Sequence, residues 1–104
     1  MSPRKKKFDV RLLRIAENDL AEIVSYIAAE RPVAALGQLT RVEKSLALLG
    51  NNPHLGKLPN DMHLIELGYR CLIVDDYLAF YTVEEQTVVV HRIIHGARDY
   101  RALF

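Results

Sequence analysis

The stretch that decides the fold is residues 17–49, ENDLAEIVSYIAAERPVAALGQLTRVEKSLALL, because it reads as two helices joined by a tight turn. Apolar residues recur every three or four positions in each half, which is the spacing of one helix face. In the first half they are Leu20, Ile23, Val24 and Ile27. In the second half they are Ala35, Leu39, Val42, Leu46 and Leu49. Pro32 ends the first helix and opens the second, since proline fits a first helical turn, and an antiparallel helix hairpin is predicted.

Strand signals lie on both sides of this hairpin. Before it, FDVRL at residues 8–12 alternates apolar and polar side chains, as a half-buried strand does. After a loop at residues 51–63, runs rich in β-branched and aromatic residues predict further strands. These runs are LIEL at 64–67, YRCLIV at 69–74, LAFYTV at 78–83 and TVVVHRII at 87–94. The end of the chain, ARDYRALF at 97–104, predicts one or two helical turns.

The order of these elements predicts an α+β fold. An N-terminal strand and an antiparallel helix hairpin are expected to pack with a mainly antiparallel sheet of three to four strands, followed by a short C-terminal tail. The hairpin would cover one face of the sheet, and the other face is expected to be open. Residues 8–104 are expected to form a single domain, preceded by a basic flexible tail at residues 1–7.

Charge and cysteine content narrow the possible functions. Removing the four cations of residues 4–7 from the formal net charge of +1 leaves −3 for residues 8–104, which disfavours a body that holds nucleic acid across a broad surface. The one cysteine, Cys71, excludes an internal disulfide and fits a reducing compartment. No apolar run approaches the length of a membrane span, so a cytoplasmic protein without membrane contact is expected.

Histidines and arginines gather where the last strand ends. Strict alternation would place Val89, His91, Ile93 and His95 on one face, and Val88, Val90, Arg92 and Ile94 on the other. The spacing of the two histidines lacks the logic of a helical metal pair, so neither a metal nor a cofactor is expected.

Some of these side chains suit phosphate chemistry. The arginine fork of Arg70 fits a phosphate or a carboxylate, or it pairs with a nearby acid. Metal-independent RNA cleavage needs a base, an acid and a cation for the phosphate. His95, Tyr100, Arg70 and Arg98 could fill those roles, although the same residue types also make an ordinary polar end to a chain.

Four segments carry a family resemblance. ENDLAEIVSYIAAERPVAA, NNPHLGKLP, GYRCLIV and VVVHRIIHGARDY occur in this order and together resemble the RelE/ParE superfamily of toxins from bacterial type II toxin–antitoxin systems. The resemblance covers nearly the whole chain after the tail. It implies a small α+β toxin that a cognate antitoxin neutralises by laying an extended or helical segment over it, in a toxin–antitoxin hetero-oligomer.

The superfamily has two functional branches. A ribosome-dependent mRNA endonuclease of the RelE type would use Arg70, His95 and Arg98, with Tyr100 nearby. The slightly acidic body and the ending YRALF depart from that branch. The helix hairpin and the HGARD segment look closer to the ParE-like branch, whose members poison DNA gyrase and need no catalytic residues. Arg70, Arg92, Arg98 and Arg101 are then the expected contacts with the target or the antitoxin. An inactive, toxin-like binding module is the third alternative.

Overall fold

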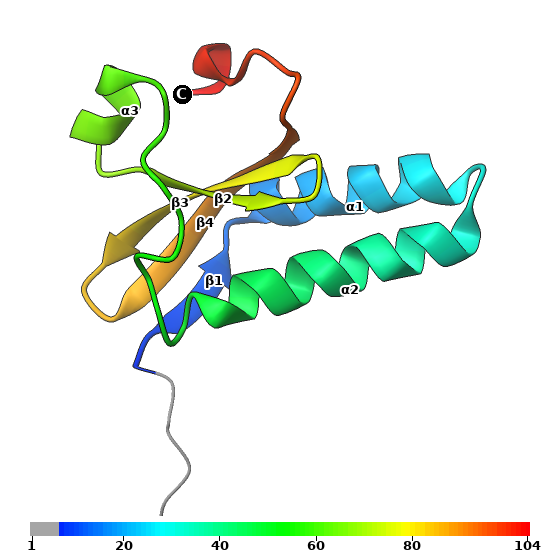
Figure 1. The fold of residues 1–104 in the computed structure, drawn as a ribbon, viewed down its shortest axis with the longest axis horizontal. Helices are drawn as coiled ribbons and strands as arrows, with labels where there is room; N and C mark the ends of the chain where they lie inside the picture. Colours follow the sequence, from blue (N-terminus) through cyan, green and yellow to red (C-terminus); the bar gives the residue numbers. More distant parts are fainter. Residues whose placement is uncertain (1–6) are drawn as a thin grey trace, which may run out of the picture.

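The computed structural model describes residues 7–104, and the basic segment of residues 1–6 lies outside the described part. The elements follow in the order β1 (Asp9–Leu12), α1 (Arg14–Ala28), α2 (Pro32–Leu48), α3 (Met62–Glu66), β2 (Arg70–Val74), β3 (Tyr77–Glu84), β4 (Thr87–His95) and the 3-10 helix η1 (Tyr100–Leu103). Figure 1 shows α1 and α2 side by side as an antiparallel hairpin next to an open sheet. The predicted α+β fold and the short helical turn at the end of the chain are confirmed.

The sheet has the strand order β1-β4-β3-β2. β2, β3 and β4 form two antiparallel hairpins, whereas β1 pairs with β4 in parallel, with Val10 opposite Val88. The two hairpin turns place Asp75 and Glu85 at φ values of 54° and 57°, in the left-handed region that side chains other than glycine adopt at a cost. The first and last strands of the sequence are therefore neighbours inside the sheet.

The main core lies between the helix hairpin and one face of the sheet. The sequence-predicted helix stripes supply Leu20, Val42, Leu46 and Leu49, all buried, and the sheet supplies Leu72, Val74, Tyr81, Val88 and Val90. Burial of this apolar area is the main force that holds the two layers together. Within residues 7–104, no helix is long and apolar enough to cross a membrane.

The segment predicted as the strand LIEL is instead part of the helix α3. Asp61 caps this helix, because its Oδ1 accepts the main-chain N–H of Leu64 at 3.1 Å. Gly68, with a φ of 88°, then turns the chain into β2. The aliphatic residues suited either element, and the prediction was wrong because it overlooked the capping aspartate.

The second face of the sheet is not open, contrary to expectation. Leu64, Cys71, Phe80 and Ile94 form a smaller buried core on this face. Its cover comes from α3 and from the end of the chain, with Tyr100, Leu103 and Phe104 packed against it. The apolar end of the sequence therefore closes a core, as its composition suggests.

Strict alternation fails on β4 because the strand contains a bulge. Phe80 pairs with Arg92, but the next residue of β3, Tyr81, pairs with Val90, so His91 is the extra residue. The bulge puts Ile93 into the main core with Val88 and Val90, not on the face of His91. The predicted faces are therefore right for His91 but wrong for Ile93 and Ile94, which are exchanged.

Candidate functional site

A buried ion pair fixes the end of β4 to α1. The carboxylate of Asp19 accepts two hydrogen bonds from the guanidinium of Arg92, at 2.8 Å from Nε and 2.9 Å from Nη2. It also accepts the main-chain N–H of Ile93 at 3.0 Å, on the side of β4 where β1 has ended. The side chains are 14% and 10% exposed, and the bonds to Asp19 raise the pKa of Arg92. Arg92, an expected partner contact, thus has its fork occupied within the fold.

Beside this ion pair lies a pocket of about 520 Å³, between α1 and the end of the sheet where β3 begins and β4 finishes. Its floor is formed by Ile23, Ile93 and Ile94, and its walls by Asp19, Glu22, Tyr26, Tyr77, His95 and Arg98. The ring of His95 packs edge-on against Tyr77, with ring centroids 5.5 Å apart, and its Nδ1 accepts the N–H of Ala97 at 3.0 Å. Two of the sequence-predicted residues, His95 and Arg98, are therefore together in one pocket.

The other two C-terminal candidates have different surroundings. Tyr100 packs on Phe80 with ring centroids 4.9 Å apart, as part of the cover of the second core. Arg101 forms an exposed ion pair with Asp99 at 3.4 Å. Both side chains lie outside the pocket that His95 and Arg98 line. Arg98 also lines a smaller hollow of about 360 Å³ with Tyr100 and Arg101, so Arg98 borders both hollows.

Arg70 anchors a loop. Its guanidinium donates to the carbonyl oxygen of Gly56 at 2.7 Å from Nη2 and 3.2 Å from Nε, and to that of His54 at 3.2 Å. Tyr81, opposite Arg70 on β3, donates its hydroxyl to the carbonyl of Pro53 at 2.7 Å and accepts the N–H of Gly56 at 2.9 Å. A Cβ at Gly56 would lie 2.7 Å from the Tyr81 oxygen, which explains why the loop has glycine there.

The sheet register separates Arg70 from the cluster at the end of β4. Arg70 pairs with Tyr81, whereas His95 pairs with Tyr77, four residues along β3. At the usual strand dimensions, the two residues are about 13 Å apart along the strands and about 10 Å apart across them. The four residues suggested for RNA cleavage are therefore not assembled around one point.

The bulge residue His91, which sequence reasoning considered only as a metal ligand, lies in a polar chain on the second face. Its Nδ1 is 3.3 Å from the Tyr69 hydroxyl and its Nε2 is 2.9 Å from the Thr82 hydroxyl, which itself donates to Glu84 at 2.8 Å. Because Thr82 gives its proton to Glu84, His91 must donate from Nε2 and accept from Tyr69 at Nδ1. Burial lowers the pKa of His91, against the opposing effect of Glu84.

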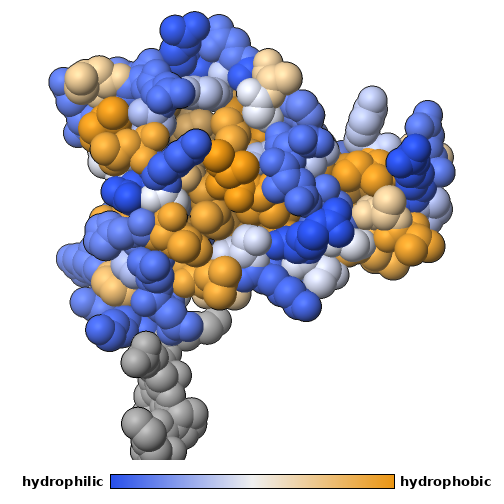
Figure 2. Space-filling view, in the orientation of Figure 1, coloured by the Kyte–Doolittle hydropathy of each residue, from blue (hydrophilic) through white to orange (hydrophobic). Residues whose placement is uncertain are grey.

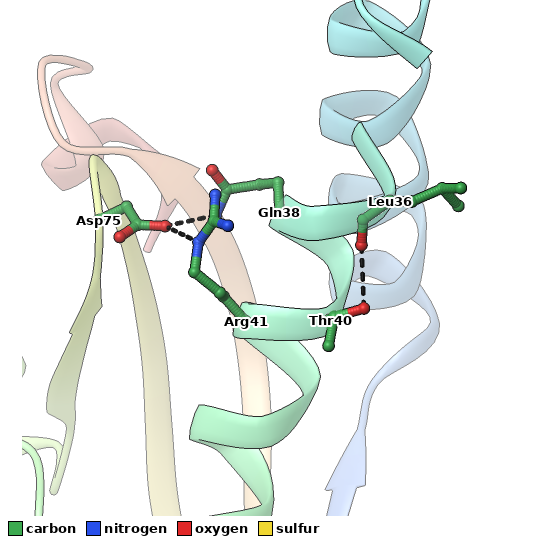
Figure 3. Close-up of polar contacts among 5 residues, drawn as sticks. All are labelled: Leu36, Gln38, Thr40, Arg41 and Asp75. Carbon is green, nitrogen blue, oxygen red and sulfur yellow. Dashed lines mark hydrogen bonds and ion pairs between the residues drawn. The ribbon is translucent and has the colours of Figure 1, made fainter. Parts of the chain in front are cut away.

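The turn between β2 and β3 is tied to α2. Asp75 accepts hydrogen bonds from Arg41 Nε at 2.7 Å and from Gln38 Nε2 at 3.0 Å. Figure 3 shows both side chains reaching from α2 to Asp75, while Leu36 points away from the sheet. The bonds from Arg41 and then Gln38 lower the pKa of Asp75. This contact holds α2 against the outer strand of the sheet.

An apolar groove of about 830 Å³ runs between β1 and the helix hairpin. Its apolar lining is Val10, Leu12, Leu20, Ala21, Val24 and Leu39, and its polar lining is Arg11, Glu17, Ser25 and Glu43. A smaller hollow of about 280 Å³ continues it toward Leu46 and Ala47. The main core is thus open to solvent along one side, next to the free edge of β1.

Side chains of the types that bind metals are spread over the described part of the chain. Residues 7–104 contain no group of three or more His, Cys, Asp or Glu side chains that could hold a metal ion. Cys71 is buried in the second core, and burial raises the pKa of its thiol to about 11. The thiol is therefore protonated and poorly reactive in the folded protein.

Comparisons with known proteins bear on the family and the fold. The family model described as "ParE toxin of type II toxin-antitoxin system, parDE" matches residues 10–100. A chain of the chromosomal ParDE toxin–antitoxin system from P. aeruginosa has a similar fold, with a TM-score of 0.74 and 18% identity over 88% of this chain and 98% of that chain. A chain of the toxin–antitoxin complex RelBE2 from Mycobacterium tuberculosis gives a TM-score of 0.59 and 24% identity over 93% of this chain and 100% of that chain. Comparison with curated proteins gives no match.

Proposed function

The chain belongs to the ParE toxin family of type II toxin–antitoxin systems, and we propose on this premise that it stops bacterial growth by binding and poisoning DNA gyrase. We choose gyrase over mRNA as the target because Arg70 is separated from His95 and Arg98. A nuclease needs its acid, base and cation within reach of one phosphate. Here Arg70 is bonded to the loop at residues 54–56, and Tyr100 packs on Phe80.

The surface charge supports the same choice. Residues 8–104 carry a net charge of −3, whereas a protein of this size that binds RNA would usually be basic. A protein target places no such demand on the charge. Both the gyrase and the ribosome act inside the bacterial cell, so the proposal places the protein in the cytoplasm.

Titration of purified protein into a gyrase supercoiling reaction tests this proposal. Inhibition that rises with toxin concentration and is reversed by the cognate antitoxin is the expected result. A supercoiling rate unaffected by excess folded protein would overturn it. Growth arrest on expression without antitoxin is a separate requirement, and normal growth under that condition would favour the inactive binding module.

Cleavage of mRNA on the ribosome is the second candidate, because His95 and Arg98 do share one pocket. A nuclease of that kind would cut mRNA in a translation reaction, and the double change His95→Gln and Arg98→Gln would abolish cutting. The gyrase proposal predicts no cutting by either protein. The two reactions, run on one preparation, separate the two functions.

The groove between β1 and the hairpin is the proposed seat of the antitoxin. Apolar side chains line it, and the outward N–H and C=O groups of Val10 and Leu12 lie along the free edge of β1. An amphipathic segment could fill the groove with one face, or pair with β1 and fill it with alternate side chains. Ala21→Arg and Ser25→Arg place large cations in the groove at exposed positions. We expect these changes to leave toxicity intact and to prevent rescue by the antitoxin.

A further inference from the structure

We propose that a second groove, between α2 and the outer edge of β2, binds an extended, acidic polypeptide segment. This groove has a volume of about 380 Å³ and lies on the opposite side of α2 from the groove beside β1. It is lined by Ser45, Leu48, Leu55, Gly56, Lys57, Cys71, Leu72 and Ile73. Binding at this surface does not depend on which target the toxin poisons.

The groove carries exposed apolar side chains that the fold leaves uncovered. Leu48, Leu55 and Ile73 are 56%, 43% and 49% exposed, and Leu58, next to Lys57, is 53% exposed. In Figure 2, apolar surface gathers in the middle of the view, where Figure 1 has β2 beside α2. Apolar residues that cluster at a strand edge are typical of a surface that another chain covers.

The main chain of β2 offers hydrogen bonds at the same place. Cys71 turns its N–H and C=O toward the outer edge, where both bond to Lys57, at 2.8 and 2.9 Å. Since strand residues two apart point their main-chain groups the same way, Ile73 directs its own N–H and C=O to that edge. Within residues 7–104, no strand or bridge pairs with Ile73 on this side. An added strand would continue the pairing that Lys57 begins.

The positive charges near this groove favour an acidic binding partner. Lys57 lines this groove, and Arg41 and Lys44 lie one helical turn before its lining residues Ser45 and Leu48 on α2. Among the described residues, the one ion pair of these three cations is that of Arg41 with Asp75. The groove therefore keeps two cations in excess. The rim of the groove beside β1 instead carries Glu17 and Glu43 against Arg11. An acidic segment is favoured beside β2 and disfavoured beside β1.

The geometry sets the pattern of that segment. Side chains on one face of a strand recur about every 6.6 Å, so leucines at alternate positions would reach the hollow between Leu48, Leu55 and Ile73. Carboxylates at the intervening positions would lie on the face of Cys71 and meet Lys57, which pairs with Cys71. An extended segment with alternating apolar and acidic residues satisfies both requirements.

A capped hexapeptide of alternating glutamate and leucine is the probe for this surface. Its binding to the full-length protein is followed through the amide NMR shifts of the protein. We expect shifts at Ile73, Lys57 and Leu48, a dissociation constant that rises with salt, and no such shifts with a lysine–leucine hexapeptide. The glutamate–leucine peptide N-methylated at alternate positions cannot pair with a strand edge, and it should bind more weakly.

Charge variants complete the test. Lys44→Glu with Lys57→Glu should weaken binding by about tenfold or more, because two cations that attract an acidic segment become anions that repel it. Arg14→Glu with Arg31→Glu makes the same change of net charge at exposed positions away from the groove and should leave binding unchanged. Shifts confined to the β1 side, no shifts at millimolar peptide, or a concentration-dependent dimer that occupies the β2 edge in sedimentation would each overturn the proposal.

Discussion

Asp19 and Arg92, which are 73 positions apart in the sequence, form a two-pronged ion pair that joins α1 to β4. The same carboxylate accepts the N–H of Ile93, so one side chain satisfies both a buried cation and an unpaired strand edge. Removing it leaves two groups without partners where little water can reach. The pair therefore matters more to the fold than an exposed ion pair would.

Asp19→Ala is expected to lower the free energy of unfolding by about 3 kcal/mol, because the buried Arg92 is left unpaired. Urea denaturation followed by circular dichroism measures the change. Glu22→Ala, one turn away on an exposed part of α1, is the control and should have a small effect. The double change Asp19→Leu and Arg92→Met should recover part of the loss. Equal losses for Asp19→Ala and Glu22→Ala would contradict this role.

Gly56→Ala should destabilise the protein by about 1–3 kcal/mol, because the added Cβ meets a buried side chain and backbone. Its nearest neighbours would be the Tyr81 oxygen at 2.7 Å and the Cys71 carbonyl at 2.8 Å. Gly37→Ala is the matched control, since Gly37 lies in α2 and its Cβ would meet the flexible end of Arg41 at 3.3 Å. Gly37→Ala should be neutral or stabilising. Thermal melts of both variants measure the two changes.

Glu85→Asn should stabilise the protein by about 0.5–1 kcal/mol, because asparagine tolerates the left-handed backbone better than glutamate. Glu85 has a φ of 57° in the exposed turn between β3 and β4. Gln86→Asn changes the next turn residue, which does not have a positive φ, and should bring no gain. A melting temperature that is unchanged or lowered by Glu85→Asn would show that the turn carries no such strain.

The free energy of unfolding should fall as the pH is lowered through about 6.5, because burial lowers the pKa of His91 in the folded state. Below that pH the unfolded chain binds a proton that folded His91 resists, so acid favours unfolding. Tyr69, Thr82 and Glu84 surround the ring, and Glu84 moderates the effect. Urea midpoints between about pH 8 and about pH 5 measure it.

His91→Gln removes this titration and should flatten the pH dependence across that range. His54→Gln is the control, since His54 is exposed, and it should leave the slope of the wild-type protein intact. Parallel pH curves for the wild-type protein and His91→Gln would show that another group causes the slope.

Arg70→Ala should lower stability by releasing the loop at residues 54–56, and it should not remove a catalytic group. It removes hydrogen bonds to the carbonyls of His54 and Gly56, so the free energy of unfolding should fall by about 1–2 kcal/mol. Inhibition of gyrase, measured below the melting temperature and per folded molecule, should persist. Complete loss of growth inhibition with the fold intact would instead support the nuclease.

The helix hairpin could be predicted from sequence because its signals are local. The stripes that contain Leu20 and Leu46 follow the helical period, and Pro32 marks the junction, so burial agreed with the pattern. The α+β class followed from the order of the elements. The helix α3 was predicted as a strand because a short apolar run fits a strand as well as a helix. The deciding feature is one hydrogen bond, which the Asp61 carboxylate accepts from the main-chain N–H of Leu64.

Less of the candidate site could be predicted from the sequence. Sequence placed Arg70, His95 and Arg98 as possible neighbours, but the register of β3 keeps Arg70 away from the other two. The bulge at His91 cannot be read from alternation, because it inserts one residue into the pattern. Asp19 lies inside α1, and its partner Arg92 becomes visible only when distant segments of the sequence are brought together.

The parallel pairing of β1 with β4 also governs when the protein becomes complete. Residues 9–12 are made well before their neighbours in the sheet, residues 87–90. A nascent chain that has just finished the helix hairpin has no β4 to close the main core, and long-range contacts of this kind form slowly. The groove beside β1 takes shape only at that closure. A chain cut short before β4 is therefore expected to lack the strand that pairs with β1 and closes the main core.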